Sequence, residues 1–390
     1  MIKETIQKLA TAYFEDVRSI RRHMHMYPEL SFEEGLTADF IAAELDKIGL
    51  DYSRNVGGNG IVVLIEGAKP GPVRALRGDF DALPIQEENT CEYASKNTGV
   101  MHACGHDVHT SCVLGAVRII SQLKENLSGT LKVIFQPAEE KLPGGASLMI
   151  KDGVLENPKV EAVIGEHVYP DLEVGKVGMR SGMYMASADE IYITIKGKGG
   201  HAALPHKLKD PILMMAEVIT GLQQVISRNC KPDIPSVLSF GKVIANGATN
   251  IIPDEVSIAG TFRTMNEEWR FSAHEFITNQ AKLICQSMGG DCDVNIEVGY
   301  PYLMNDEELT SKCYKKAVDY LGKDNVIDLD LRMTSEDFAF FSHHAPACFY
   351  RLGTRNTEKG IVHGLHTSRF DVDEEALRIG MGLLAYQFLE

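Results

Sequence analysis

One segment of the chain, Met101–Thr110, is dense in side chains that bind metals. It holds three histidines, one cysteine and one aspartate. Thiolate, imidazole and carboxylate groups in one place are the ligands that transition-metal sites use. The same residue types also allow a Cys/His nucleophilic pair. A buried cysteine among surface histidines is the alternative without chemistry, so the segment alone leaves three interpretations open.

Other reactive side chains follow short apolar runs that we expect to be strands. In open α/β sheets, ligands bind at the carboxyl ends of the strands. Neighbouring residues on an extended backbone point in different directions, so one carboxylate of an adjacent pair can bind a metal while the other faces substrate or water. The candidates are Asp79 and Asp81 after Val73–Leu76, Glu139 and Glu140 after Leu131–Phe135, His167 after Ala162–Ile164, and His363 and His366 in a loop with Gly364.

The hydrophobic spacing predicts the scaffold that must position these residues. Apolar residues recur every three or four positions from Ile6 to Ile20, which predicts an amphipathic opening helix. Strands alternating with helices indicate an α/β layered domain, and we expect a long loop between residues 321 and 374. The predicted helices are Thr37–Ile48, Ser111–Leu123, Leu309–Leu321 and Glu374–Phe388, and a further strand is Ile61–Ile65.

The middle of the chain has a different pattern. Ile191, Ile193 and Ile195 alternate with polar residues as in a half-buried strand, and Asp210-Pro211 opens a helix. The order strand, helix, strand, strand, helix, strand over about residues 186–298 is that of a ferredoxin-like unit. We therefore expect a discontinuous domain of residues 1–182 and 299–390, interrupted by an inserted domain of residues 183–298.

The composition limits the classes of partner. The chain has 390 residues, with 39 Lys plus Arg, 54 Asp plus Glu, and a formal net charge of −15. Such acidity repels phosphate backbones and anionic lipid surfaces, so nucleic-acid and membrane partners are not expected. The eight cysteines form no CxxC pair, and no uncharged apolar run approaches the roughly 18 residues of a membrane span. We expect a cytoplasmic protein.

The motifs together resemble peptidase family M20, in particular its bacterial N-acyl-amino-acid amidohydrolases, hippurate hydrolases and plant auxin-conjugate hydrolases. The resemblance covers essentially the whole chain and is specific in order and spacing. The segments that carry it are His23–Ser31, Asp79–Pro84, Met101–His109, Gln136–Glu140, His201–His206, Ser335–Phe338 and Leu365–Phe370.

The resemblance implies a phosphorylase/hydrolase-like catalytic domain with an inserted ferredoxin-like (βαββαβ) lid and dimerisation domain. It implies that Glu139 is the general base and that Asp81 orients a metal-bound imidazole. The role of Asp79 stays open, because other branches of the family have a histidine there. The implied ligands of two divalent ions, Mn²⁺ by resemblance with Zn²⁺, Co²⁺ or Ni²⁺ as alternatives, are Cys104, His106, Glu140, His167 and His366.

The implied reaction is hydrolysis of the amide bond of an N-acyl amino acid. His201 is implied as the donor to the oxyanion, from the inserted domain of a neighbouring subunit in a homodimer. A free substrate carboxylate is best bound by a planar guanidinium, so Arg263 is our candidate for that contact, with Asn250 beside it in motif order. The alternatives are a metallo-dipeptidase or carboxypeptidase of the same family and, from another class, a catalytically silent binding protein.

Overall fold

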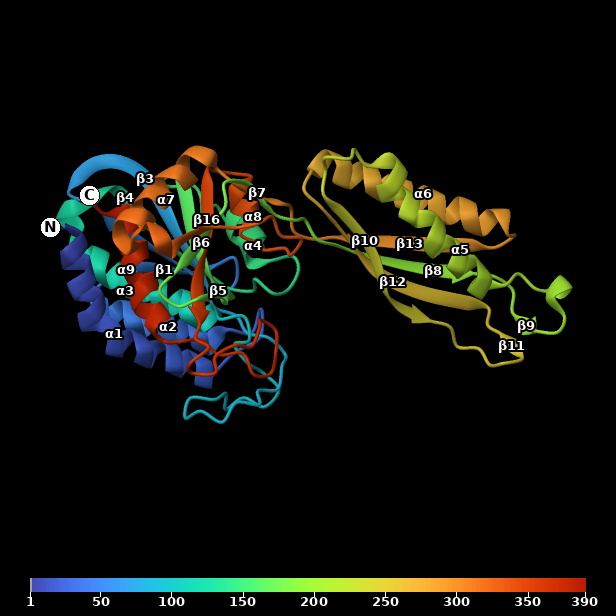
Figure 1. Cartoon of the computed structure of the whole chain (residues 1–390), viewed down its shortest axis with the longest axis horizontal. Helices are drawn as coiled ribbons and strands as arrows, with labels where there is room; N and C mark the ends of the chain where they lie inside the picture. Colours follow the sequence, from blue (N-terminus) through green and yellow to red (C-terminus); the bar gives the residue numbers. More distant parts are fainter. Residues whose placement is uncertain (1) are drawn as a thin grey trace. The chain divides into compact units, whose positions relative to one another are not determined.

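The computed structural model describes residues 2–390. Its contacts divide the chain into two compact units (Figure 1). The first unit consists of Met1–Tyr184, Met304–Leu331 and Asp337–Glu390, and the second of Met185–Leu303 and Arg332–Glu336. Among residues 2–390, no helix is both long and apolar enough to cross a membrane.

A mixed eight-stranded sheet forms the centre of the first unit, in the order β1-β2-β4-β3-β5-β16-β6-β15. Its central strands β4, β3, β5 and β16 run parallel to one another. Parallel strands covered on both faces usually have nearly continuous apolar runs. Here β3, β4 and β16 each include a buried charged residue, Arg77, Lys132 and Arg351. The bounds are β1 Tyr52–Val56, β2 Gly60–Glu66, β3 Lys69–Asp79, β4 Ser128–Gln136, β5 Ala162–Glu173, β6 Val177–Met179, β15 Val326–Asp328 and β16 Ala347–Arg355.

Helices cover both faces of this sheet (Figure 1). Helices α1, α3 and α9 pack against one another, with α3 also against β3 and α9 against β16, whereas α4 and α8 pack together elsewhere on the sheet. The bounds are α1 Ile2–Met26, α2 Gly35–Ile48, α3 His106–Gln122, α4 Gly145–Lys151, α7 Glu307–Leu321, α8 Ala339–Ser342 and α9 Glu375–Phe388. Two short strands, β7 Gly182–Met185 and β14 Leu303–Asn305, form a separate sheet.

Two of the predicted boundaries are wrong. Helix α3 begins at His106 rather than Ser111, directly after Gly105, whose left-handed φ of 82° glycine adopts without strain. The expected loop between residues 321 and 374 contains β16, a central strand. Arg351 obscured it in the sequence, yet this arginine is only 3% exposed and donates from Nε to the Tyr184 hydroxyl at 2.9 Å.

The second unit is built on a four-stranded antiparallel sheet in the order β10-β12-β8-β13. One face of the sheet packs against α5 and α6, and the alternating Ile191, Ile193 and Ile195 of β8 lie in that core. A separate short pair, β9 with β11, lies beyond one end of β8 and β12. The bounds are β8 Asp189–Lys196, β9 Gly200–His201, α5 Pro211–Gln224, β10 Ser236–Ile244, β11 Ile251–Ile252, β12 Glu255–Thr264, α6 Glu267–Ser287 and β13 Asp291–Val298.

Candidate metal centre

The carboxyl ends of the parallel strands bring the reactive residues of the first unit to one edge of the sheet. Asp79, the last residue of β3, lies opposite Gln136, the last residue of β4. On the other side, β3 pairs Arg77 with Gly165 of β5, two residues before His167. Helix α3 packs against β3 and begins with His106. Side chains from distant parts of the sequence therefore meet at this edge.

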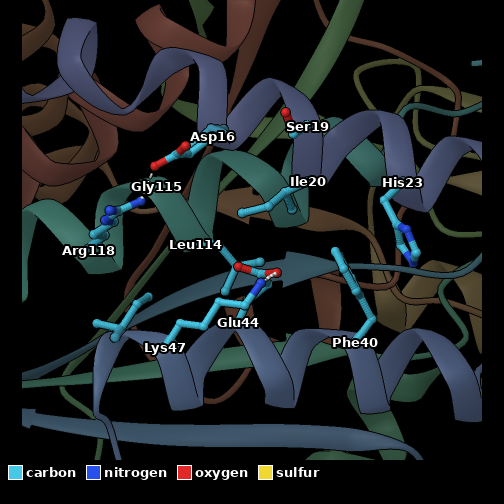
Figure 2. A pocket seen from close by; sticks show the side chains of 12 residues that line it. Asp16, Ser19, Ile20, His23, Phe40, Glu44, Lys47, Leu114, Gly115 and Arg118 are labelled. Atoms are coloured by element: carbon cyan, nitrogen blue, oxygen red, sulfur yellow. Dashed lines mark hydrogen bonds and ion pairs between the residues drawn. The ribbon is translucent and has the colours of Figure 1, made fainter.

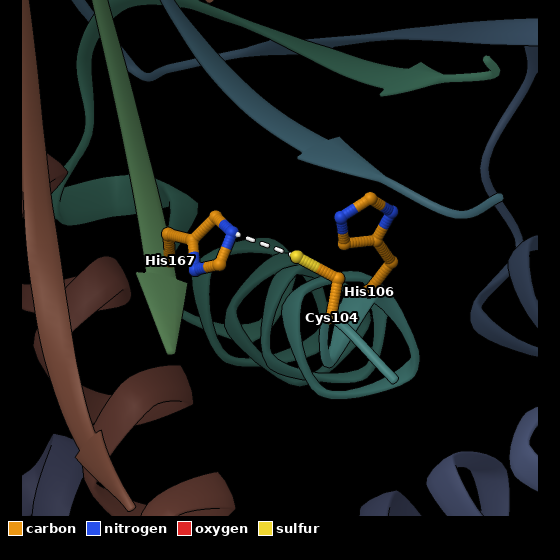
Figure 3. A group of neighbouring side chains, drawn as sticks. All are labelled: Cys104, His106 and His167. Atoms are coloured by element: carbon orange, nitrogen blue, oxygen red, sulfur yellow. Dashed lines mark hydrogen bonds between the residues drawn. The ribbon is translucent and has the colours of Figure 1, made fainter. Parts of the chain in front are cut away.

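All five predicted metal ligands lie in overlapping groups of possible donor atoms. Within each group the donor atoms lie within 4.8 Å of one another. Figure 3 shows one group, in which His167 extends from β5 toward the sulfur of Cys104, with His106 nearby on α3. The groups are Cys104, His106 and His167; His106, Glu139 and Glu140; Cys104, Glu140 and His366; and Asp79, His106 and His109.

Hydrogen bonds fix the direction in which the two buried imidazoles point. His106 Nδ1 donates to Asp81 Oδ1 at 3.1 Å, and His167 Nδ1 donates to the carbonyl of Val168 at 2.7 Å. Each ring therefore presents its Nε2 atom toward the cluster, and His167 Nε2 lies 3.4 Å from Cys104 Sγ. A hydrogen-bonded second nitrogen is the usual support of a metal-binding histidine.

Asp81 has the contacts of an orienting carboxylate. Its Oδ1 holds His106, while its Oδ2 accepts from the Ser31 hydroxyl at 2.7 Å and from the backbone N–H of Glu140 at 3.0 Å. Burial raises the pKa of Asp81, but these hydrogen bonds and the His106 ring outweigh burial and lower it below the usual value. Asp81 is thus an ionised acceptor shared between a histidine and the turn that carries Glu140.

Asp79 and His109 are hydrogen-bonded to each other, and each also has a second partner. Asp79 Oδ2 accepts from Arg77 at 2.6 Å, and Asp79 Oδ1 accepts from His109 Nδ1 at 2.6 Å. His109 Nε2 in turn accepts from the backbone N–H of Val168 at 2.9 Å. Both nitrogens of His109 are therefore engaged, which leaves it unsuited to bind a metal. Asp79 serves as the buried counter-ion of Arg77.

Two buried atoms of the cluster make no hydrogen bond within the described residues, His106 Nε2 and Glu140 Oε1. His106 Nε2 lies 3.8 Å from Glu140 Oε1 and 3.9 Å from Glu139 Oε2. Buried polar atoms are otherwise nearly always paired. Together with the mixed sulfur, nitrogen and oxygen donors, these two atoms fit divalent cations such as Mn²⁺, Zn²⁺, Co²⁺ or Ni²⁺.

The charges of the cluster also favour a bound cation. Burial lowers the pKa of His106, but the nearby carboxylates of Asp79, Asp81 and Glu140 outweigh it and raise the pKa to about 10. Burial, followed by the same kind of negative neighbours, raises the pKa of Cys104 well above its usual value. An excess of buried negative charge therefore favours a positive charge at this place. A cation that binds there would displace the protons of His106 Nε2 and the Cys104 thiol.

Glu139 and Glu140 lie in the bend after β4 and contact different groups. Glu139 is 6% exposed, and its Oε1 accepts from the backbone N–H of Asp337 at 3.3 Å. Glu140 Oε1 lies 3.2 Å from His366 Nε2, and the His366 side chain is 54% exposed. The cluster is therefore buried on the side of the sheet and open on the side of His366.

The remaining predicted site residues lie in the second unit. His201 is the last residue of β9; its Nδ1 accepts from the backbone N–H of Ala203 at 3.1 Å, so its Nε2 carries the proton. The backbone carbonyl of Asn250 accepts from the backbone N–H of Ala202 at 3.0 Å, so Asn250 lies close to His201. Arg263 lies near the opposite end of β12, where its Nη1 donates to the Ser335 hydroxyl at 3.1 Å.

Asn250 and Arg263 are neighbours in motif order but lie toward opposite ends of one strand. Asn250 precedes β12, which begins at Glu255, whereas Arg263 is its last residue but one. A strand rises about 3.3 Å per residue, so the length of β12 alone separates the two by roughly 25 Å. Asn250 and Arg263 of one chain do not lie side by side.

A pocket of ≈ 440 Å³ on the first unit contains none of the predicted site residues. Figure 2 shows it between α1 and α2, with α3 contributing Leu114, Gly115 and Arg118. Its charged groups pair with one another: Arg118 with Asp16 at 2.7 Å and Lys47 with Glu44 at 2.5 Å. Since no cluster of donor atoms lines this pocket, the metal-binding cluster is the better candidate for chemistry.

Several supporting residues were not predicted from the sequence. Ser31 contacts Asp81, Arg77 contacts Asp79, and the Asp337 backbone contacts Glu139. Ser31 and Asp337 lie in segments that carry the family resemblance, which was the one available signal. Their roles depend on contacts between residues far apart in the sequence.

The chain is similar to known proteins over most of its length. A model of peptidase family M20/M25/M40 matches residues 75–389. The chain is 44% identical over 309 residues to an N-acyl-L-amino acid amidohydrolase of Geobacillus stearothermophilus, covering 79% of this chain and 83% of the relative. It is 37% identical over 375 residues to thermostable carboxypeptidase 1 of Saccharolobus solfataricus, covering 95% and 94%. The crystal structure of the Bacillus subtilis YXEP protein, a dinuclear metal binding peptidase from the M20 family, superposes with a TM-score of 0.83 at 34% identity, covering 97% and 98%.

Proposed function

The chain belongs to peptidase family M20/M25/M40, and from that premise we propose that it is a metal-dependent amidohydrolase of N-acyl amino acids. It cleaves the amide bond to release a carboxylate and a free amino acid. The observation that carries the proposal is the cluster at the carboxyl edge of the sheet, where metal donors surround an additional carboxylate, Glu139. The amidohydrolase of Geobacillus stearothermophilus supports the choice of substrate class.

The proposed ligands of two divalent ions are the five residues whose donor atoms cluster. Softness of the Cys104 thiolate favours Zn²⁺ or Co²⁺, whereas the resemblance to the amidohydrolase subgroup favours Mn²⁺, which we propose as the native metal. His106 and His167 contribute Nε2, since Nδ1 of each ring is already hydrogen-bonded. The ligands are Cys104, His106, Glu140, His167 and His366.

Glu139 is the proposed general base. Divalent ions, when bound, lower the pKa of the attacking water and polarise the scissile carbonyl. Glu139 removes a proton from the water as the water oxygen bonds to the carbonyl carbon. It then delivers that proton to the amine nitrogen as the C–N bond breaks. Asp81 holds His106 in the required tautomer throughout.

Arg263 and Asn250 are the proposed contacts of the substrate carboxylate, and His201 the proposed donor to the oxyanion. His201 carries its proton on Nε2, as a donor must. The length of β12 separates Asn250 and His201 from Arg263, so one small substrate cannot touch both ends of the same second unit. We therefore propose a homodimer in which His201 and Asn250 of one chain serve the substrate bound by the other.

The inserted domain of residues 183–298 is the proposed lid and dimerisation domain. Its order β8-α5-β10-β12-α6-β13 and its strand order β10-β12-β8-β13 support a ferredoxin-like assignment. The net charge of −15 supports the absence of a nucleic-acid partner. We propose a cytoplasmic location on the same sequence arguments.

The test is an activity screen of metal-stripped protein reloaded with Mn²⁺, Zn²⁺, Co²⁺ or Ni²⁺. The substrates are N-acetyl amino acids, N-benzoyl amino acids and dipeptides with a free amino terminus. We expect hydrolysis of the N-acyl compounds, fastest with Mn²⁺. Absence of hydrolysis with every metal would instead favour a silent binding protein.

The second candidate is a metallo-dipeptidase or carboxypeptidase. The similarity to the Saccharolobus solfataricus carboxypeptidase favours it, whereas the cysteine in the ligand cluster favours the amidohydrolase. The same screen separates them. Cleavage of dipeptides at higher kcat/KM than their N-acetyl counterparts would favour the peptidase.

A further inference from the structure

The two carboxylates at the metal centre follow a residue in an unfavourable backbone conformation. Ala138 immediately precedes Glu139, is fully buried, and has a φ of 52°. This left-handed conformation costs free energy for any L-residue other than glycine. Such a conformation persists only where its surroundings hold it. The direction in which Glu139 and Glu140 leave the backbone depends on this residue.

One buried side chain holds Ala138. Glu34 precedes the first residue of α2 and is 0% exposed. Its Oε1 accepts from the backbone N–H of Ala138 at 2.9 Å and from that of Phe32 at 2.8 Å, and its Oε2 accepts from Asn59 Nδ2 at 3.0 Å. A second contact fixes the other side of the turn, where the carbonyl of Ala138 accepts from Gly145 N–H at 2.9 Å.

The loop that supplies Glu34 also supports the orienting carboxylate. Ser31, three residues earlier, donates to Asp81 Oδ2 at 2.7 Å, and the same oxygen accepts from the backbone N–H of Glu140. Glu34 therefore contacts the turn at Ala138 directly, and Ser31 contacts the next residues through Asp81. Each of these bonds is accepted by a buried carboxyl group, that of Glu34 or that of Asp81.

We propose that Glu34 is a positioning residue, whose carboxylate holds Ala138 in its left-handed conformation and thereby aims Glu139 at the substrate and Glu140 at the metal ions. The inference rests on the roles proposed above for Glu139 and Glu140. Glu34 acts through the backbone, and the required property is an acceptor at Oε1. Negative charge as such is not required.

The test compares substitutions of Glu34 with a matched control one position earlier. Glu33 is the same residue type but exposed, so Glu33→Ala should leave kcat and Mn²⁺ affinity unchanged. Glu34→Ala should lower kcat about 10- to 100-fold and weaken Mn²⁺ binding by a similar factor, the usual range for a residue that orients a metal ligand. KM should change little, because Glu34 contacts no substrate. Mn²⁺ affinity is measured by competition with a chelator.

Two further variants separate positioning from general stability. Glu34→Gln keeps an oxygen that accepts from Ala138 and Phe32, and its amide can donate to a rotated Asn59, so it should retain nearly all of kcat. Ala138→Gly in the Glu34→Ala protein should recover part of both losses, because glycine adopts a positive φ without strain. If Glu34 acted only on the general stability of the fold, this glycine would change the melting temperature but recover neither kcat nor Mn²⁺ affinity.

Folded Glu34→Ala with wild-type kcat and Mn²⁺ affinity would overturn the proposal. If Glu34→Ala does not fold, Glu34→Asp, which withdraws the carboxylate from Ala138 by one methylene, should show intermediate losses, and wild-type values in that variant would overturn it equally. A wrong proposed function would give a different result from a wrong role of Glu34. In that case the wild type hydrolyses no N-acyl amino acid, while the order of Mn²⁺ affinities still tests the role of Glu34.

Discussion

Each unit of the molecule contains a buried polar cluster, and the two clusters differ in how completely their hydrogen bonds are made. In the second unit, Asp189 accepts from Arg270, from His274 and from the backbone N–H of Gly299, so both of its oxygens are used. Arg270 also donates to Glu267 and to the carbonyl of Gly299.

The cluster in the first unit is supported from outside but incomplete at its centre. Asp81 is fully engaged, whereas His106 Nε2 and Glu140 Oε1 make no hydrogen bond within the described residues. Complete buried networks rigidify a fold, and incomplete ones are costly unless a ligand completes them. We therefore read the Asp189 cluster as structural and the His106 cluster as the place of chemistry. The predictions below test that distinction.

The largest expected effect is on turnover. Glu139→Gln should lower kcat by about 10²- to 10⁴-fold, because the amide cannot accept a proton from water. The substitution is nearly isosteric, so metal content should stay at the wild-type value. Steady-state kinetics and elemental analysis measure the two quantities. Full retained activity would refute the assignment of Glu139 as the base.

The second effect is on stability rather than turnover. Asp189→Asn removes the fully buried counter-ion of Arg270 and leaves only Glu267, whose side chain is 27% exposed. The loss should therefore approach the roughly 3–5 kcal/mol that breaking a buried ion pair costs. Chemical denaturation should report this loss in the free energy of unfolding. The metal content of the folded protein should not change. If Asp189→Asn released metal without lowering stability, the distinction between the clusters would be wrong.

The pH dependence provides a check on the same residue. Burial raises the pKa of Asp189, but the hydrogen bonds from Arg270 and His274 outweigh burial and lower it below the usual value. The stabilisation is therefore fully present above the unfolded pKa, about 3.9, and is lost as pH falls through the lower folded value. Denaturation between pH 5 and pH 2 should show this loss in the wild type and a smaller one in Asp189→Asn.

The third effect is on metal affinity. Cys104→Ala removes a proposed ligand and should weaken Mn²⁺ binding by about 100-fold or more, since even residues that only orient ligands contribute 10- to 100-fold. The fold should be preserved, as judged by circular dichroism. Cys112→Ala is the matched control, because Cys112 is equally buried on α3 but lies in no cluster of donor atoms. Equal metal content in the two variants would remove Cys104 from the ligand set.

The comparison also explains what the sequence could predict. The candidate ligands were identifiable because Cys104 and His106 lie in one short segment, and because Glu140 and His167 follow apolar runs. Those runs became part of β4 and the first residues of β5, although β5 continues past His167. Parallel strands bring such ends together, so the predicted strands implied that these residues form one cluster. The family resemblance added the choice of His366, which no local pattern distinguishes from His363.

Other features could not be predicted, for physical reasons. The sequence hid β16 because a strand with Arg351 inside it lacks the expected apolar pattern, although Tyr184 satisfies that arginine. Glu34 and Glu33 are adjacent and chemically equal, and only the tertiary fold buries one of them. The distance between Asn250 and Arg263 depends on the strand between them, which motif order does not measure.

The smallest expected effect concerns a third group of charges, at the pocket of Figure 2. Asp16 pairs with Arg118 at 2.7 Å, but their side chains are 60% and 39% exposed. Asp16→Asn makes the same chemical change as Asp189→Asn in a solvated setting, where an ion pair contributes about 0.2–1 kcal/mol and is screened by salt. The free energy of unfolding should therefore fall by no more than this amount, and the difference should disappear at 1 M NaCl, whereas the loss in Asp189→Asn should persist. A large loss in Asp16→Asn that resists salt would mean that burial does not decide which charged residues hold this fold together.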